Sequence, residues 1–367
     1  MFKLINDVNN INGDIMKNNN YHLFLLLTTF VRGLVETFSL VFLYKKGFNI
    51  DNILLFLFLM YLFGMIVNYI SLKINYKIVL IISSLLYGIS YIYLSYMNTS
   101  IVSLIIFSCL LSFSTYSYHC IRHYLALHYK IKNTSNIVNI MFIGIIISSI
   151  LGTFFVSKLN ILVISIILFI LSFLSLIPIF KVDIKINIDN KKLCIGKRKI
   201  LFNIFEQFKV IFLELQPLFL YLYINDSIKY VGWFNIIINI SSLIVLFLIS
   251  KKNIKNKFLT ICLILSLVLF LKINITNQII LIIIAIIEGI FIKLYERCSL
   301  MNLYNIENNP INKYLLIEEE IFFGTKTLII GIFLLTGITL KTIMTLCIIG
   351  IIISGFIFKI KNKTNYT

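Results

Sequence analysis

The chain has 367 residues, of which 59% are hydrophobic and only 13% are charged. A soluble domain averages about 45–50% apolar and roughly 25% charged residues, so this composition excludes a single water-soluble globule and indicates a polytopic membrane protein. The net charge of +18 arises from 33 Lys and Arg against 15 Asp and Glu. On a chain without room for a soluble domain, this excess predicts basic loops beside an anionic lipid surface rather than a nucleic-acid partner.

Apolar runs follow one another along the chain after a polar, Asn-rich N-terminal segment. A membrane-spanning helix needs about 20 apolar residues, and fewer where flanking Lys side chains can reach the interface. We therefore predict twelve transmembrane helices, of which the ninth is the weakest because it lies between Lys257 and Lys272. The predicted ranges are 22–44, 53–72, 78–96, 101–121, 137–157, 160–180, 203–224, 230–250, 258–273, 278–294, 315–337 and 339–358.

Basic residues are concentrated in alternate loops. Lys73 and Lys77 lie between the second and third predicted helices, and the most basic segment is 181–202, whereas the intervening loops hold few basic residues, among them Lys272. Cytoplasmic loops of membrane proteins carry the excess of Lys and Arg. This pattern predicts a multi-pass protein of the cell (inner) membrane with both termini in the cytoplasm.

The segment 181–202 divides six predicted helices from six. Three short matches between the halves share an offset near half the chain length, which is the mark of an internal repeat. The matches pair Leu34-Val35-Glu36 with Phe212-Leu213-Glu214, Ser71-Leu72-Lys73 with Ser250-Lys251-Lys252, and Arg122 with Arg297. We predict two pseudo-symmetric six-helix bundles, 1–180 and 203–367, joined by a basic cytoplasmic linker at 181–202.

This arrangement resembles the major facilitator superfamily of secondary transporters over essentially the whole chain. The resemblance is architectural. Where that family usually has Gly-x-x-x-Asp-Arg-x-Gly-Arg-Lys between helices 2 and 3, this chain has Gly64-Met-Ile-Val-Asn68-Tyr69, followed by Lys73, Asn75 and Lys77. The resemblance implies that helices 1, 4, 7 and 10 line a central cavity.

Ionisable side chains deep in the predicted spans are the main functional candidates, because each costs about 2.5–3.5 kcal/mol to insert. Arg32 and Glu36 lie in the first helix, His119 in the fourth, Glu214 in the seventh and Glu288 in the tenth. These are the helices that line the cavity in the fold that the chain resembles. We expect Arg32, Glu36, Glu214 and Glu288 to point into one water-filled chamber.

Several roles are open to these residues. Arg32 and Glu36 are four residues apart on one helix face, so they form either a structural ion pair or an anchor for an anionic substrate group. Glu214 and Glu288 have no opposite charge nearby on their own helices. Since desolvation favours the protonated form of a carboxyl group, both suit proton exchange with the cavity; alternatively, the acids bind a cationic substrate in a facilitator.

Other polar residues in the spans are candidate substrate contacts. Gln216 precedes Pro217, which removes a backbone hydrogen bond and either kinks the seventh helix or marks a substrate site. Asn235 and Asn239 share a face of the eighth helix, as interhelical hydrogen-bonding groups or as substrate contacts. His119 and His123 also share a helix face, but no further ligand completes a metal site, so we predict neither a metal nor a cofactor.

Four residues are candidates for a gate. Lys73 and Lys77 lie in the loop between helices 2 and 3, and Glu320 and Lys326 lie near the start of helix 11. The acids at that helix start also suit the helix dipole without any gating role.

The chain has no Gly-rich phosphate loop and no Gly-x-Ser-x-Gly motif, and its loops are too short for a nucleotide-binding domain. An enzyme or an ATP-driven pump is therefore not predicted. We predict a secondary active transporter, monomeric in the lipid bilayer, that moves a small-molecule substrate by alternating access and is coupled to protons. The alternative is a non-transporting membrane protein, such as a scramblase, sensor or assembly factor, that retains the transporter fold.

Overall fold

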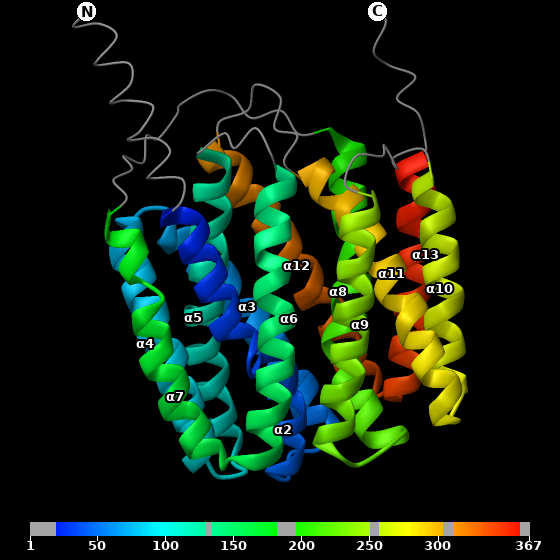
Figure 1. Cartoon of the computed structure of the whole chain (residues 1–367), viewed down its shortest axis with the longest axis horizontal. Helices are drawn as coiled ribbons and strands as arrows, with labels where there is room; N and C mark the ends of the chain where they lie inside the picture. Colours follow the sequence, from blue (N-terminus) through cyan, green and yellow to red (C-terminus); the bar gives the residue numbers. More distant parts are fainter. Residues whose placement is uncertain (1–19, 129–133, 182–195, 250–256, 304–310, 360–367) are drawn as a thin grey trace, which may run out of the picture.

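The computed structural model describes residues 20–128, 134–181, 196–249, 257–303 and 311–359. Within these ranges the chain is helical and forms twelve long, roughly parallel and antiparallel spans (Figure 1). The predicted all-α fold with twelve spans is confirmed. The N-terminal segment and most of the predicted linker lie outside the described residues.

The first half contains six spans. The first runs over Asn20–Lys45 and is interrupted, because a helix over 20–33 is followed by a turn at 34–35 and by two short helices. The elements after that turn are η1 (Glu36–Phe38), α2 (Ser39–Lys45), α3 (Ile50–Ser71), α4 (Tyr76–Tyr96), α5 (Ile101–His128), α6 (Thr134–Lys158), α7 (Ile161–Leu174) and η2 (Ile177–Lys181).

The second half contains the other six spans, which are α8 (Lys197–Tyr223), α9 (Ile228–Ile249), α10 (Phe258–Asn274), α11 (Gln278–Leu303), α12 (Ile311–Thr336) and α13 (Leu340–Lys359). Most ends lie close to the predicted ones. The exceptions are α5, α8 and α11, which extend beyond the apolar runs at 101–121, 203–224 and 278–294. In each case a polar segment continues the helix at the same end of the molecule.

The two halves repeat one packing pattern. Ile228, which begins α9, stands 178 residues after Ile50 at the start of α3, and Gln278 of α11 stands 177 residues after Ile101 of α5. Within the halves, α3 packs against α5 as α9 packs against α11, and α4 packs against α7 as α10 packs against α13. Two equivalent seams join the halves, α3 with α12 and α6 with α9. The predicted pair of pseudo-symmetric six-helix bundles is confirmed.

Both seams contain a glycine at a close approach. A Cβ atom on Gly232 of α9 would lie 2.4 Å from Thr153 Oγ1 of α6. A Cβ atom on Gly331 of α12 would lie 3.2 Å from Phe58 Cε2 of α3. The absence of a side chain at these two positions therefore brings the helices of the two halves together.

Large apolar side chains cover the outside of the molecule. Leu335 is 88% exposed and Ile279 is 72% exposed, whereas many Ser and Thr side chains are buried between helices. In the described part of the chain, eight helices are long and apolar enough to cross a membrane. The 143–158 part of α6 and the helix α10 are shorter apolar helices. An apolar exterior around a polar interior is expected where lipid rather than water is the solvent. The chain is a polytopic membrane protein.

Two faces of the molecule are used as references below. The helix over 20–33 begins, and α13 ends, on one face, which we call the terminal face (Figure 1). The turns before α3 and α11 lie on the opposite face. Asn49 Oδ1 caps α3 by accepting a hydrogen bond from Asn52 N at 2.8 Å, and Asn277 caps α11 through Ile279 N at 3.0 Å. Side-chain caps of this kind satisfy free N–H groups at a helix start.

Candidate functional site

A cavity of about 680 Å³ lies between the two halves. Its wall is formed by η1, α2, α3, α5 and α6 of the first half and by α8, α9, α11 and α12 of the second. Of the residues predicted from the sequence as functional, the wall contains Glu36, His119, Glu214, Gln216, Asn235, Asn239 and Lys326. The cavity is therefore built where the two repeats meet.

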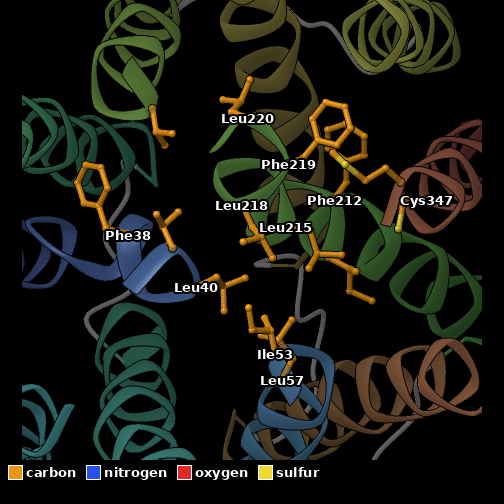
Figure 2. Close-up of a cluster of buried hydrophobic side chains, with 14 of the residues drawn as sticks. Phe38, Leu40, Ile53, Leu57, Phe212, Leu215, Leu218, Phe219, Leu220 and Cys347 are labelled. Carbon is orange, nitrogen blue, oxygen red and sulfur yellow. The ribbon is translucent and has the colours of Figure 1, made fainter. Parts of the chain in front are cut away.

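Apolar side chains close the cavity toward the opposite face. Leu40 of α2 and Leu57 of α3 come from the first half and Leu220 of α8 from the second, and all three line the cavity. Figure 2 shows Leu40, Ile53 and Leu57 directed toward Leu215 and Leu218 of α8. These side chains are buried. We call the six residues together the apolar seal.

The interruption of the first span separates Arg32 from Glu36. Glu36 lies on η1 and is exposed on the cavity wall, and the described residues form no ion pair with it within 4.0 Å. Arg32 lies at the end of the preceding helix and turns into the interior of the first half. The expectation of a shared face assumed an unbroken helix; in the structure Glu36 lies on the cavity wall, whereas Arg32 contacts Ser114 of α5.

Arg32 is held by groups of α4 and α5. Its Nη2 donates to the Ser114 carbonyl oxygen at 3.0 Å, and its guanidinium carbon lies 4.6 Å from the Tyr87 ring centroid and 4.2 Å from that of Tyr118. Tyr87 also donates to the Arg32 carbonyl oxygen at 2.9 Å, which satisfies a backbone group freed at the end of the helix. Arg32 is not part of the described cavity wall, contrary to the expectation from the sequence.

Glu214 and Lys326 form an ion pair across the second half, with Lys326 Nζ 3.5 Å from Glu214 Oε1. The two residues come from α8 and α12. Lys326 is buried, and its Nζ lies 4.8 Å from the centroid of the Tyr61 ring on α3. Glu214 Oε2 is buried without a hydrogen-bond partner in the described part of the chain. The sequence left Glu214 without a neighbour because its partner lies on another helix.

Glu288 lies outside the described cavity wall and pairs with Lys272. The two side chains are 0% exposed, and Nζ of Lys272 lies 2.7 Å from Oε2 of Glu288. Gln216 lies within hydrogen-bonding reach of the same carboxylate and also lines the cavity. The placement of Lys272 in a loop is wrong, because it lies inside α10 near its end, where it neutralises a buried acid.

The half of the cavity nearer the terminal face carries further charged residues that sequence reasoning missed. Lys209 Nζ lies 4.0 Å from Glu296 Oε1, Ser299 donates to Glu206, and Arg122 donates to His123 Nε2 at 3.2 Å. Arg122 directly follows the predicted span 101–121, and Lys209 lies in the first third of the predicted span 203–224. In the structure, Arg122 lies in the part of α5 that continues beyond residue 121. Lys209 lies in the half of α8 that is nearer the terminal face. The available signal was the run of charged residues at the terminal-face ends of these helices.

Asn235 and Asn239 join the halves as well as lining the cavity. Asn239 Nδ2 donates to Ser149 Oγ of α6 at 2.7 Å, and Asn235 Nδ2 lies 3.4 Å from the same oxygen. Asn235 also lies 3.5 Å from Thr37 Oγ1 on η1. Both predicted uses of these residues, between helices and toward a substrate, are therefore compatible with their positions.

The four candidate gate residues are not gathered at one place. Lys73 is exposed at the terminal face, with Nζ 3.6 Å from the Tyr69 ring centroid. Lys77 donates to the Phe180 carbonyl oxygen at 3.4 Å. Glu320 is partly buried near the start of α12, six residues before Lys326, which lies on the cavity wall.

The described residues contain no group of three or more His, Cys, Asp and Glu side chains placed to hold a metal ion. His119 and His123 both line the cavity beside Arg122. A neighbouring guanidinium disfavours binding of another cation at this pair.

The fold is shared with solved transporter structures. A crystal structure of a mutant of the nucleoside transporter NupG matches with a TM-score of 0.66 and 13% identity, over 94% of this chain and 98% of that chain. A bacterial homologue of the iron transporter ferroportin, in its outward-facing state, matches with a TM-score of 0.66 and 10% identity, over 93% and 98%. No protein-family model matches the chain, and no curated protein matches its sequence. At these identities the likeness establishes the fold.

Proposed function

We propose that this protein is a secondary transporter of the major facilitator superfamily that carries a small organic solute by alternating access. The observation that carries the proposal is the cavity of about 680 Å³ between two pseudo-symmetric halves. Substrate sites of transporters built from repeats lie near the midplane at the repeat interface. The apolar seal closes this cavity toward one face of the membrane. The moving bodies are 1–180 and 203–367, with 181–202 as the linker.

The predicted site residues have two kinds of role in this proposal. Glu36, His119, Gln216, Asn235 and Asn239 contact the substrate. Arg32 and Glu288 act from within the bundles by holding the cavity-lining helices in place. No resident cofactor is required, because the energy comes from a solute or ion gradient.

Glu214 is the proposed proton-coupling residue. Its carboxylate lies on the cavity wall, and its partner Lys326 stands on α12, which packs against α3 of the other half. Protonation of Glu214 abolishes the attraction to Lys326 and so couples proton binding to the α3–α12 seam. In proteoliposomes, Glu214→Gln should abolish substrate-driven proton movement, while substrate exchange persists at a lower affinity because one carboxylate of the cavity is lost. Retained proton movement in this variant would remove Glu214 from the coupling role.

The proposed orientation places the terminal face in the cytoplasm of a cell whose inner membrane holds the protein as a monomer. The concentration of Lys and Arg in the loops of that face supports it. Tags at the two chain ends should be protected from protease in right-side-out vesicles and accessible in inverted ones. Accessibility in the reverse sense would invert the proposed direction of the cavity.

Alternating access is tested by two distance measurements in a cysteine-free background. One pair of spin labels, at Tyr96 and Lys341, reports on the opposite face; the other, at Ile74 and Lys197, reports on the terminal face. All four side chains are exposed. In lipid nanodiscs we expect two distance populations for each pair, with one pair lengthening as the other shortens. A single unchanging population at both faces would contradict transport and favour the non-transporting alternative.

A further inference from the structure

The cavity wall is acidic although the chain as a whole is strongly basic. The sequence has only 15 Asp and Glu against 33 Lys and Arg. On the cavity wall the balance reverses. The acidic residues there are Glu36, Glu206, Glu214, Glu296 and Glu319, and the Lys and Arg residues are Arg122, Lys209 and Lys326.

Two of the three Lys and Arg residues of the wall are engaged with particular acids. Lys326 pairs with Glu214 at 3.5 Å, and Lys209 approaches Glu296 at 4.0 Å. Glu36 has no such partner among the described residues and is exposed toward the cavity. Glu36 therefore presents a carboxylate that is available to a ligand, close to the apolar seal at the deep end of the cavity.

Some buried polar atoms of the cavity wall lack a hydrogen-bond partner. Among the described residues, two lining side chains have a buried atom without a hydrogen-bond partner, and these atoms are Glu214 Oε2 and Gln216 Oε1. Both are acceptors. Gln216 is 7% exposed, and its amide nitrogen is the group suited to face the Glu288 carboxylate, which leaves the oxygen without a donor.

The backbone of α8 adds another acceptor. Pro217 has no N–H group, so the carbonyl oxygen of Leu213 cannot receive the hydrogen bond that a helix normally supplies from that position. Leu213 and Pro217 both line the cavity. Because η1 packs against α8, these acceptors and Glu36 belong to one region of the wall. Buried acceptors without donors call for a ligand that brings N–H groups.

Aromatic rings complete the surroundings. Tyr116 of α5 and Phe323 of α12 lie on the wall with ring centroids 4.2 Å apart, and Lys326 Nζ already lies against the Tyr61 ring at 4.8 Å. Aromatic faces attract ammonium groups. The apolar seal provides a surface for a carbon skeleton.

We infer that the substrate of this cavity is an organic cation, a small molecule with at least one protonated amine. Its ammonium group lies between Glu36 and Glu214 and displaces Lys326 from Glu214. An ammonium fits better than a metal ion, because the described residues offer no cluster of three metal-ligating side chains. The inference rests on the proposed transport function and specifies its substrate class.

Binding is tested with matched probes on the purified full-length protein in nanodiscs. The amines are 1,4-diaminobutane and phenethylamine, and their neutral counterparts are 1,4-butanediol and 2-phenylethanol. Calorimetric titration should detect binding of at least one amine and of neither alcohol. Glu36→Gln should weaken amine binding about 10- to 100-fold, because a charge-assisted contact is lost. Asp51→Asn, which removes an exposed carboxylate at the start of α3, is the matched control and should leave binding unchanged.

Lys326→Met gives a prediction of opposite sign. It keeps a long apolar side chain but removes the resident cation that competes for Glu214, so amine affinity should rise about tenfold. Loss of amine binding in this variant would overturn the inference. If Glu36→Gln does not fold, Glu36→Asp serves in its place and should retain amine binding within a few fold.

Three other outcomes would also overturn the inference: equal binding of an amine and its alcohol, binding of Mn²⁺ in place of amines, or no response to either amine. The spin-label distances separate these results from a failure of the transport proposal. Two exchanging populations without amine binding reject the substrate class alone. A single population at both faces rejects transport itself.

Discussion

Removing one member of the buried Lys272–Glu288 pair should destabilise the protein strongly, whereas replacing both members should not. At the observed separation of 2.7 Å, the attraction is about 6 kcal/mol for an effective dielectric constant of about 20. Much of this attraction offsets the desolvation of two side chains that have no access to water. Glu288→Gln leaves the ammonium group without its counter-charge, so the free energy of unfolding should fall by about 3–5 kcal/mol.

The opposite single substitution has a different pH dependence. Lys272→Met leaves a buried carboxyl group, which can become neutral by binding a proton. The unfolded chain releases that proton at ordinary pH, so the destabilisation should grow as the pH rises and shrink as it falls. The double variant Lys272→Met/Glu288→Gln buries no charge, and its free energy of unfolding should lie within about 2 kcal/mol of the native value.

The assay is a double-mutant cycle, measured by equilibrium unfolding in detergent micelles at fixed pH. We expect a coupling energy of about 2–3 kcal/mol between the two residues. Lys341→Met, at the exposed start of α13, controls for the general effect of replacing Lys by Met. A coupling energy below about 0.5 kcal/mol would refute the reasoning, because the two charges would then not depend on each other in the fold.

Three further predictions concern packing and the contact between the halves. Gly152→Ala would place a Cβ atom 2.2 Å from a backbone oxygen of the first span, so the free energy of unfolding, measured by thermal unfolding, should fall by about 1–3 kcal/mol. Gly324→Ala is the control, because a Cβ atom has room there. Equal stability of the two variants would contradict the packing. Arg32→Lys keeps the charge but loses the planar group between two tyrosine rings, and the free energy of unfolding should fall by about 1–2 kcal/mol; unfolding curves identical to the native ones would rule this out. Asn239→Ala removes the 2.7 Å hydrogen bond to Ser149 between the halves. Because such a hydrogen bond contributes about 1 kcal/mol, its loss should shift the ratio of the spin-label populations about fivefold toward the other state. Unshifted populations would show that the bond does not bias them.

The helical framework could be predicted because runs of apolar residues must match the thickness of the bilayer. The range 53–72 predicted one span, and the structure has α3 at Ile50–Ser71. The internal matches at an offset of about 178 residues likewise agree with the repeated packing. These features depend on the order of residues along the chain, which a single sequence contains.

Partners between helices could not be predicted, because they depend on how each helix is rotated about its own axis. Lys272 lies at the edge of an apolar run, so the sequence places it in a loop. In the structure its ammonium group reaches a carboxylate on α11. Glu214 similarly has a partner on α12 that its own helix does not reveal.

The polar ends of the helices were also missed. Glu206 and Glu296 lie where the sequence becomes less apolar. A prediction based on hydropathy therefore ends the span near them or supports it only weakly. The helix continues because its backbone hydrogen bonds do not depend on side-chain polarity, and the cavity solvates the charged groups. One local signal was present at the interruption of the first span: Gly33 stands beside the break, and glycine weakens a helix.

The glycines at the two seams affect how the halves can move. Opposite Thr153 and Phe58, Gly232 and Gly331 contribute backbone and no side chain to the contact. Side chains that interdigitate must separate before two helices can shift, whereas a helix contact with few side chains permits shear. The helices of the α3–α12 pair and of the α6–α9 pair can thus shift along each other with fewer side chains to disengage, while the two halves stay closely packed.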